Sequence, residues 1–314
     1  MTKRRGGHPM PRVKTNLERI NHPGPSVLCP ACGEKTSSAR YRYQTQNTEA
    51  HIYHCPSCTL EFLRPLPLAD MSERQMKSIG DAEMFHSALL QRLHNSLVIQ
   101  PEIRKVRKLL GRKAFSMLDV GCGTGWIAKI WADSGTIVTG LEPSAERAIF
   151  ARNRGIQVHC CYAEELASEE CFDLIIIRHV VEHLENPAAT LKNLKKHLNP
   201  GGLVLVVLPN IDCIGRRIFD TAWTWVLPWH CNFFNPRSLA KLTEVCGFNV
   251  VKSWQTPSPL WYPDSFRRKY PRLGRLLKKI PLAMFLFAPL VCFGFLIGQS
   301  DNISMILRPS PLEE

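Results

Sequence analysis

The stretch Leu118-Asp119-Val120-Gly121-Cys122-Gly123-Thr124-Gly125-Trp126 decides which fold this chain adopts. The apolar run at residues 116–120 predicts a strand, and the pattern of residues 126–134 predicts a helix. Between them, glycine at alternate positions lets the backbone approach a ligand closely, and the helix N-terminus offers free N–H groups. The stretch therefore predicts a ligand-binding loop at the carboxyl end of a strand.

The spacing of this loop argues against two common ligand classes. Position 126 is Trp, which breaks the G-x-G-x-x-G dinucleotide pattern, and no Gly-Lys-Ser/Thr follows, as a phosphate-binding loop requires. The second predicted strand, residues 136–142, ends on Glu142. A doubly wound fold places an acid there against a ribose diol.

Four cysteines near the N-terminus have the spacing of a metal site. Cys29 and Cys32 form one C-x2-C pair, and Cys55 and Cys58 form a second after 22 intervening residues. Two such pairs complete a tetrahedral four-thiolate zinc site. Residues 39–43 and 51–54 then predict the short strands of a zinc ribbon, whose small core makes the metal the main source of its folding energy. The alternative is four buried cysteines without a metal.

Strands and helices alternate from residue 115 onward. The predicted strands are residues 116–120, 136–142, 157–161, 172–178, 203–208, 248–254 and 302–307, and the predicted helices are 126–134, 144–154, 187–198 and 237–246. Several of the strands are continuous apolar runs, which a parallel sheet covered on both faces requires. We therefore predict a doubly wound, Rossmann-like α/β sheet with a small N-terminal zinc ribbon and a C-terminal hydrophobic insertion.

The glycine spacing and Glu142 resemble motif I of class I S-adenosylmethionine (SAM) methyltransferases. The run 172–184, Phe-Asp-Leu-Ile-Ile-Ile-Arg-His-Val-Val-Glu-His-Leu, resembles strand four and the following turn of that superfamily. With Trp229-His230 before Phe233-Phe234 and a terminal Gly247-Phe248, the motif order is similar to the group that contains quinone O-methyltransferases and many glycan-cluster enzymes. Members of that group also carry an N-terminal four-cysteine ribbon.

The resemblance implies a set of SAM-binding residues. Asp119 would surround the methionine part together with Gly121, Gly123 and Gly125, Glu142 would meet the ribose hydroxyls, and Arg178 would lie beside the methionine end. Many relatives have an acid that accepts from the adenine amino group, whereas this chain has Tyr162 there, followed by Ala163, Glu164 and Glu165. Which of these residues meets adenine stays open.

Three histidines are candidates for the catalytic base. Methyl transfer from a sulfonium is an in-line displacement, so the protein must orient both reactants and remove a proton from a hydroxyl acceptor. Histidine suits that role near neutral pH. His179, His183 and His230 are the candidates, with His230 and His179 ahead; each could instead have only a packing or capping role.

The pattern His179-x-x-Glu182-His183 also matches a zinc-protease motif. That match is interpreted as accidental, because the motif leaves a buried strand rather than lying on one continuous helix. Residues at i, i+3 and i+4 could still hold a divalent cation. Quinone O-methyltransferases are similar here but have an acid at the position of His179.

The net charge of +13 is concentrated in two segments. Residues 1–20 have six Lys or Arg against one acid, and residues 257–280 have seven against one. Such patches suit nucleic acid, an anionic membrane or solubility alone. The predicted organisation is a flexible basic arm (1–25), a zinc ribbon (26–66), a helical lid or linker (67–112) interrupted near Gly80 and Pro101, and a methyltransferase domain (113–314) with a basic, apolar insertion (257–299).

The insertion contains residues 280–297, eighteen residues without a charge directly after the basic run. The length admits a transmembrane helix, but Pro281, Pro289 and Gly294 interrupt it. We expect a segment that lies in the membrane interface, with basic residues on lipid phosphates. The alternatives are an apolar segment packed on the domain or on a second subunit, and a full span.

The predicted function is SAM-dependent O-methylation of a lipid-linked, glycan-related or quinone-like acceptor at the membrane surface. Twelve cysteines without a secretory signal favour a reduced, cytoplasmic setting, peripheral on the inner face of the membrane. The alternatives are an RNA methyltransferase that binds nucleic acid through ribbon and arm, and a non-catalytic SAM-binding module. The acceptor, the methylated atom and the oligomeric state are not determined by the sequence.

Overall fold

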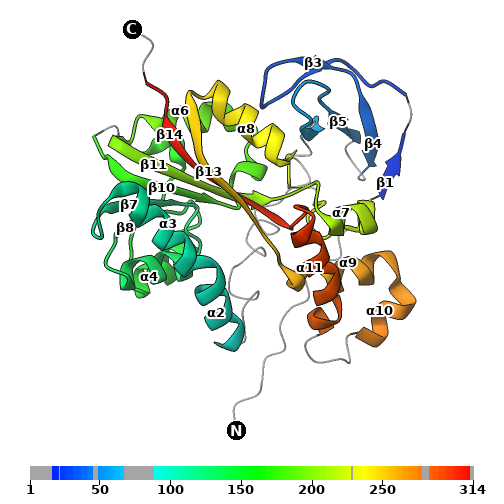
Figure 1. Cartoon of the computed structure of the whole chain (residues 1–314). Helices are drawn as coiled ribbons and strands as arrows, with labels where there is room; N and C mark the ends of the chain where they lie inside the picture. The colour runs from blue at the N-terminus through cyan, green and yellow to red at the C-terminus, as the bar shows by residue number, and fades with distance from the viewer. Residues whose placement is uncertain are drawn as a thin grey trace.

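A computed structural model describes residues 16–20, 22–44, 49–66, 88–167, 169–227, 229–277 and 283–311. Most of the predicted arm, residues 67–87 of the predicted lid, with Gly80, and residues 278–282 of the insertion lie outside this described part. The described chain forms one large sheet with helices on both faces, a smaller sheet beside it (Figure 1) and a separate two-stranded sheet in the N-terminal segment.

The large sheet confirms the doubly wound α/β prediction. Its seven strands have the order β13-β14-β11-β10-β7-β8-β9. The bounds are β7 Ser116–Val120, β8 Ile137–Leu141, β9 Gln157–His159, β10 Phe172–Arg178, β11 Leu198–Pro209, β13 Phe248–Thr256 and β14 Asn302–Pro309. Five neighbouring strands, β9, β8, β7, β10 and β11, are parallel to one another. β14 lies between β11 and β13 and is antiparallel to both. The first five strands therefore bring their carboxyl ends to one edge.

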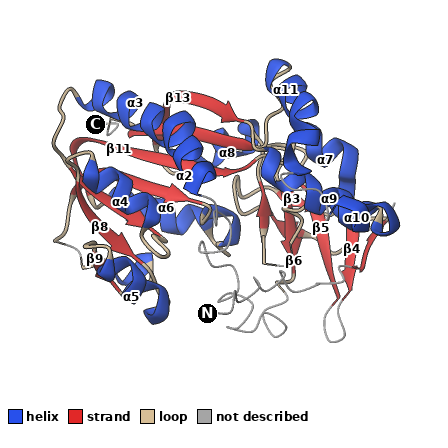
Figure 2. Ribbon diagram, turned by 90° about the horizontal axis from the view of Figure 1, so that it is seen from below, coloured by secondary structure: helices blue, strands red, loops and turns tan. Residues whose placement is uncertain are grey.

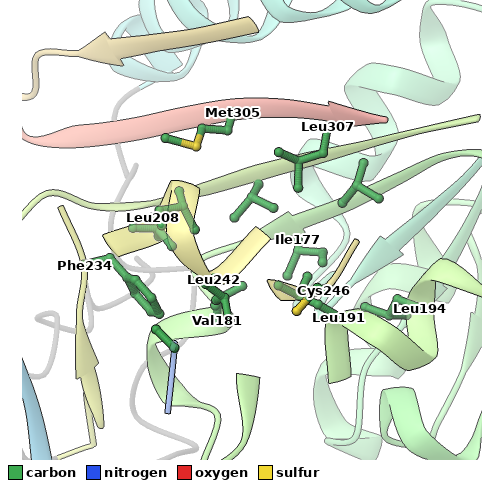
Figure 3. Close-up of a cluster of buried hydrophobic side chains, with 14 of the residues drawn as sticks. Ile177, Val181, Leu191, Leu194, Leu208, Phe234, Leu242, Cys246, Met305 and Leu307 are labelled. Atoms are coloured by element: carbon green, nitrogen blue, oxygen red, sulfur yellow. The ribbon is translucent and has the colours of Figure 1, made fainter. Parts of the chain in front are cut away.

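Helices cover the two faces of this sheet with separate cores. One face packs against α3 (Gln100–Leu110), α4 (Trp126–Asp133) and α5 (Ala145–Asn153). The other packs against α6 (Pro187–Lys195) and α8 (Pro236–Val245), as the side chains in Figure 3 show. The predicted helix 187–198 was three residues too long, because the chain turns at Lys196 and enters β11 at Leu198.

The N-terminal segment forms a ribbon that shares its sheet with the main domain. Its strands are β1 Asn16–Arg19, β2 Val27–Leu28, β3 Lys35–Thr36, β4 Ala39–Gln44, β5 Glu49–His54 and β6 Glu61–Arg64. A two-residue strand, β12 (Asn232–Phe233), extends the ribbon sheet from the methyltransferase side, in the order β1-β4-β5-β6-β12. Residues 16–19, expected to belong to a flexible arm, instead pair with β4.

A helical segment leads from the described part of the predicted lid into the sheet. It runs without a break through α2 (Ala88–His94), a π-helical turn η2 (Asn95–Ile99) and α3. The interruption expected near Pro101 takes the form of this π-helical turn and is not a break in the chain's helical path. Inside a continuous helix proline cannot donate the usual i→i−4 hydrogen bond, and the wider π-helical turn directly before it is where the hydrogen-bond pattern changes.

The insertion between β13 and β14 consists of short helical pieces beside the ribbon (Figure 2). They are η6 (Pro259–Trp261), α9 (Tyr262–Lys269), α10 (Pro271–Leu277), η7 (Ala283–Phe287) and α11 (Ala288–Leu296). All of these pieces except α10 contribute to a hydrophobic cluster that they share with the ribbon and with α7 (Ile214–Phe219) and η5 (Asp220–Ala222). None of the helices in the described ranges has both the length and the apolar character that a membrane crossing needs.

Candidate functional site

The glycine loop after β7 lies where the sequence placed it. Gly121, Gly123 and Gly125 have φ angles of 71°, 57° and 77°, which L-residues rarely adopt. A Cβ on Gly121 would lie 2.6 Å from Val180 Cγ2, in the turn after β10. With β7 and β10 in their present positions, only glycine therefore fits at position 121. The loop presents backbone atoms rather than side chains to a ligand.

Glu142 is fixed at the same edge by the loop itself. Its side chain is buried and accepts hydrogen bonds from Gly123 N at 3.0 Å and Ser144 N at 2.9 Å. Arg147 Nε lies 3.8 Å from one of its oxygens. The carboxylate is thus held beside the glycine loop before any ligand arrives.

The other predicted SAM-binding residues lie at neighbouring strand ends. Asp119 is buried in β7, next to β8 and β10. Tyr162 is 60% exposed and Ala163 is buried at the start of the short helix η3 (Ala163–Glu165), after β9. Arg178, at the end of β10, forms an ion pair with Glu102 of α3, in which both side chains are largely buried. The guanidinium of Arg178 is therefore paired with the side chain of Glu102. Glu102 was not among the residues that the resemblance placed around SAM.

The three predicted catalytic histidines surround one buried carboxylate, Glu182. The turn after β10 carries His179 and, in η4 (Val181–His183), His183, whereas His230 comes from the segment before β12. His179 has a φ of 53°, a left-handed conformation that is strained for histidine. His179 Nδ1 lies 3.3 Å from Glu182 Oε1. His183 Nδ1 contacts the carbonyl oxygen of Trp229 at 2.9 Å, and the His183 and His230 rings lie 4.7 Å apart. The structure thus gathers all three rings.

Electrostatics give these groups different protonation states. Burial alone would raise the pKa of Glu182, but the adjacent ring of His179 and the rings of His183 and His230 hold that pKa at about 2. Burial, with repulsion from His183, lowers the pKa of His230 to about 3. At neutral pH, Glu182 is therefore charged and His230 is neutral.

Trp225 covers this cluster. Its ring stacks on His179, with centroids 5.4 Å apart and an angle of 6° between the planes, and on His230 at 5.7 Å and 14°. The ring centroid of Trp261, in the insertion, lies 4.6 Å from that of Trp225, with an angle of 62° between the planes. The insertion therefore reaches the histidine cluster through two tryptophans.

Three residues of this site were not among the predicted site residues. Glu182 was visible in His-x-x-Glu-His, but its position among the histidines depends on His230, 47 residues after His183 in the chain. Trp225 and Glu102 lie in no recognisable motif. Only their positions in the folded chain connect them with the site.

Among the residues that the structure describes, two groups of side chains have the geometry of a metal site. The Sγ atoms of Cys29 and Cys58, and those of Cys32 and Cys55, are 3.5 Å apart, and all four lie within 4.8 Å of one another. A tetrahedral zinc–thiolate site has sulfur atoms about 3.8 Å apart, so the four cysteines fit zinc. The second group is Glu182, His183 and His230, also within 4.8 Å. This trio replaces the i, i+3, i+4 set considered from the sequence, in which His179 was a ligand.

Comparison with known proteins places these motifs in a family. A family model described as "Methyltransferase domain" matches residues 88–253, more than half of the chain. The ubiquinone biosynthesis O-methyltransferase of Idiomarina loihiensis is 30% identical over 158 residues, which are 46% of this chain and 64% of that protein. The mitochondrial ubiquinone biosynthesis O-methyltransferase of Rattus norvegicus is 28% identical over 153 residues, or 43% and 44%.

The match to these proteins is partial. The chain spans about half the length of the curated relatives it matches. Among solved structures, a putative sarcosine dimethylglycine methyltransferase from Galdieria sulphuraria aligns with a TM-score of 0.48 and 16% identity, over 69% of this chain and 86% of that one. On the family model's match to more than half of its residues, the chain belongs to the methyltransferase-domain family.

Proposed function

We propose that this protein is a SAM-dependent O-methyltransferase that acts on a hydroxyl group of a small acceptor. The observation that carries the proposal is the position of His179 and Glu182 directly after β10, the strand that pairs with β7 and its glycine loop. A proton acceptor and a nucleoside-type binding loop on adjacent strand ends are what methyl transfer to a hydroxyl requires.

The residues present fit SAM. The side-chain-free glycine loop and Glu142 would hold it, and SAM would supply a methyl group bound to a sulfonium sulfur, which would leave as a neutral thioether. This chain must therefore orient the acceptor hydroxyl and take its proton. The ring of His179 accepts the hydroxyl proton, and the Glu182 carboxylate beside Nδ1 stabilises the imidazolium that results.

His230 suits a different role from that of a base. A ring with a pKa near 3 is a poor proton acceptor at neutral pH, and the ring is fully buried. We assign it to the wall of the acceptor site, where it supports Trp225 and faces Glu182. A divalent cation on Glu182, His183 and His230 is the competing way to activate a hydroxyl, because a bound cation lowers the pKa of its ligand.

The test is a search for methyl acceptors with the full chain. Tritiated SAM is incubated with hydroxylated quinones, lipid-linked glycans and RNA, with and without EDTA followed by Mg²⁺ or Zn²⁺. Labelling of a hydroxyl in the quinone or glycan fraction that Gly123→Arg abolishes is the expected result. Transfer that requires added Mg²⁺ in protein that still holds its ribbon zinc by metal analysis would move the activation step from His179 to a cation on Glu182, His183 and His230. Labelled RNA alone, or SAM binding without transfer to any fraction, would overturn the proposal.

Zinc on Cys29, Cys32, Cys55 and Cys58 is part of this proposal, in a structural role. The four thiolates leave no position open for substrate, which distinguishes structural from catalytic zinc sites. The ribbon that they close has no separate core, because its cysteines belong to the same hydrophobic cluster as α6 and α8.

The finer part of the proposal is that the insertion docks the enzyme on an anionic membrane. Exposed apolar side chains gather on η7 and α11, with Leu296 80% and Phe293 53% exposed. On α10, Arg272 and Arg275 are exposed next to Leu273 and Leu276. Apolar side chains for the acyl region and arginines for lipid phosphates are the combination that interfacial helices use.

Replacing Phe293 and Leu296 together by serine is expected to weaken binding to vesicles of phosphatidylglycerol and phosphatidylcholine by about a hundredfold or more, because each loses about 1.5–3 kcal/mol of burial in lipid and about 1.4 kcal/mol is a tenfold change. High salt should weaken binding without abolishing it. Ile137→Ser is the matched control, since that side chain is 72% exposed on the main sheet. Sedimentation with vesicles at low and high salt measures the binding of the wild-type protein and of both variants. A wild-type protein that ignores vesicles but dimerises in size-exclusion chromatography would show that the apolar face contacts a second copy instead.

A further inference from the structure

The four-cysteine ribbon is connected directly to the histidine cluster by a shared strand. β6 begins three residues after Cys58 and pairs antiparallel with β12, which follows His230 after one residue. Leu63 N donates to Cys231 O at 2.9 Å, which extends the ladder to the residue next to His230. The ribbon edge therefore sets the register of the segment that carries this histidine.

A second connection fixes the far end of that segment. The side chain of Asn235 caps α8 and donates through Nδ2 to Thr59 Oγ1 at 2.9 Å. Arg237 of α8 donates to Ser57 O at 3.0 Å. Both partners lie in or directly after the second cysteine pair, so ordering this pair also orders the start of α8.

The opposite side of the segment contacts the turn after β10. Cys231 N donates to Glu182 O at 2.8 Å, and Asn232 Nδ2 donates to Leu184 O at 2.7 Å. His183 Nδ1 contacts Trp229 O. Residues 229–232 thus lie between the ribbon on one side and, on the other, the turn after β10 that contains Glu182 and His183.

We propose that metal binding by the four cysteines positions His230 and Trp229, so that the ribbon is a structural part of the acceptor site. This rests on the proposed function only in calling the histidine cluster the acceptor site. The short ribbon buries little apolar surface by itself, so without metal β6 loses its order and β12, with two residues, loses its partner strand. The glycine loop makes none of these contacts and keeps its structure.

Hydrogen exchange on the full chain tests the proposal without an activity assay. Zinc is removed with a chelator and then restored. In the metal-free protein, amides in residues 229–234 should exchange at least about tenfold faster, whereas the amides of residues 118–126 are unchanged, because local opening is confined to the elements that lose contacts. SAM affinity by calorimetry should change by less than about twofold. Restored zinc should restore protection. Unchanged exchange in residues 229–234 in the metal-free protein would overturn the proposal.

Two variants of Thr59, which leave the four cysteines in place, distinguish loss of the contact between Thr59 and Asn235 from general unfolding of the ribbon. Thr59→Ala removes the hydroxyl that Asn235 contacts, and Thr59→Ser retains it. Both should hold one zinc per chain by metal analysis. Faster exchange at residues 231–235 is expected in Thr59→Ala alone. Equal protection in the two variants would show that the ribbon and α8 are not coupled through this contact. If instead no acceptor is ever methylated, the proposed function fails while these exchange results still stand.

Discussion

Replacing His179 by alanine is expected to lower kcat for methyl transfer by roughly 10²–10⁴-fold, the usual contribution of a positioned general base. The acceptor hydroxyl then has no side chain to take its proton. SAM affinity should stay within about twofold, because the contacts of the ring are with Glu182 and Trp225, and it is not part of the glycine loop. Single-turnover kinetics with the identified acceptor and calorimetry with SAM measure the two quantities separately.

Glu182→Gln is the companion change. It keeps the size of the side chain but removes the charge that stabilises the His179 imidazolium, so a large part of the kcat loss should recur with KM for SAM unchanged. Because Glu182 is buried among three histidines, thermal unfolding must first show that the variant folds. His230→Gln is the comparison at the neutral ring. If His230→Gln abolishes turnover while His179→Ala retains it, the base has been assigned to the wrong histidine.

Replacing Glu142 by alanine is expected to weaken SAM binding by about tenfold or more and also to destabilise the fold. A charge-assisted hydrogen bond to the ribose contributes about 1.5–3 kcal/mol, and about 1.4 kcal/mol is a tenfold change in affinity. In addition, Gly123 N and Ser144 N each lose their acceptor, which costs about 1–3 kcal/mol for a donor that stays buried. Calorimetry with SAM and denaturant unfolding measure the two effects.

The control for this change is Glu146→Ala, on the exposed side of α5, which removes the same charge away from the loop. It should leave both affinity and stability near those of the unchanged protein, since surface substitutions are usually within about 0.5 kcal/mol. Unaltered SAM affinity in Glu142→Ala would remove this residue from the binding site and leave it only as a support of the glycine loop.

The sheet could be predicted from the sequence because its determinants are local. Most of the strands from β7 to β11 contain an apolar run, and the carboxyl ends of parallel strands meet at one edge whatever their spacing in the chain. The loop glycines and Glu142 therefore had to lie together, and they do, joined by the hydrogen bond from Gly123. The antiparallel last strand was also located correctly, although no pattern in the sequence predicted its pairing between β11 and β13.

The contacts between distant segments could not be predicted in this way. β12 is two residues long and has no strand signal of its own; it forms because the ribbon edge is in reach. Trp225 joins the histidine cluster only because the insertion holds the preceding residue: Thr224 N donates to Ser265 Oγ, and Thr224 Oγ1 donates to the Trp261 carbonyl. Such positions depend on tertiary packing, which overrides local propensity.

The insertion starts and ends on a pair of facing residues. Thr256 of β13 lies opposite Asn302 of β14, so the 45 residues from 257 to 301 leave and re-enter the sheet at one point, as the loop of a hairpin does. Because loop closure becomes only slowly more costly with length, by about 0.6 kcal/mol per doubling, a segment here can grow, shrink or be exchanged in evolution with little effect on the strands. Since this segment reaches Trp225 through Trp261, the same exchange would alter what the histidine cluster meets while the cofactor loop stays as it is.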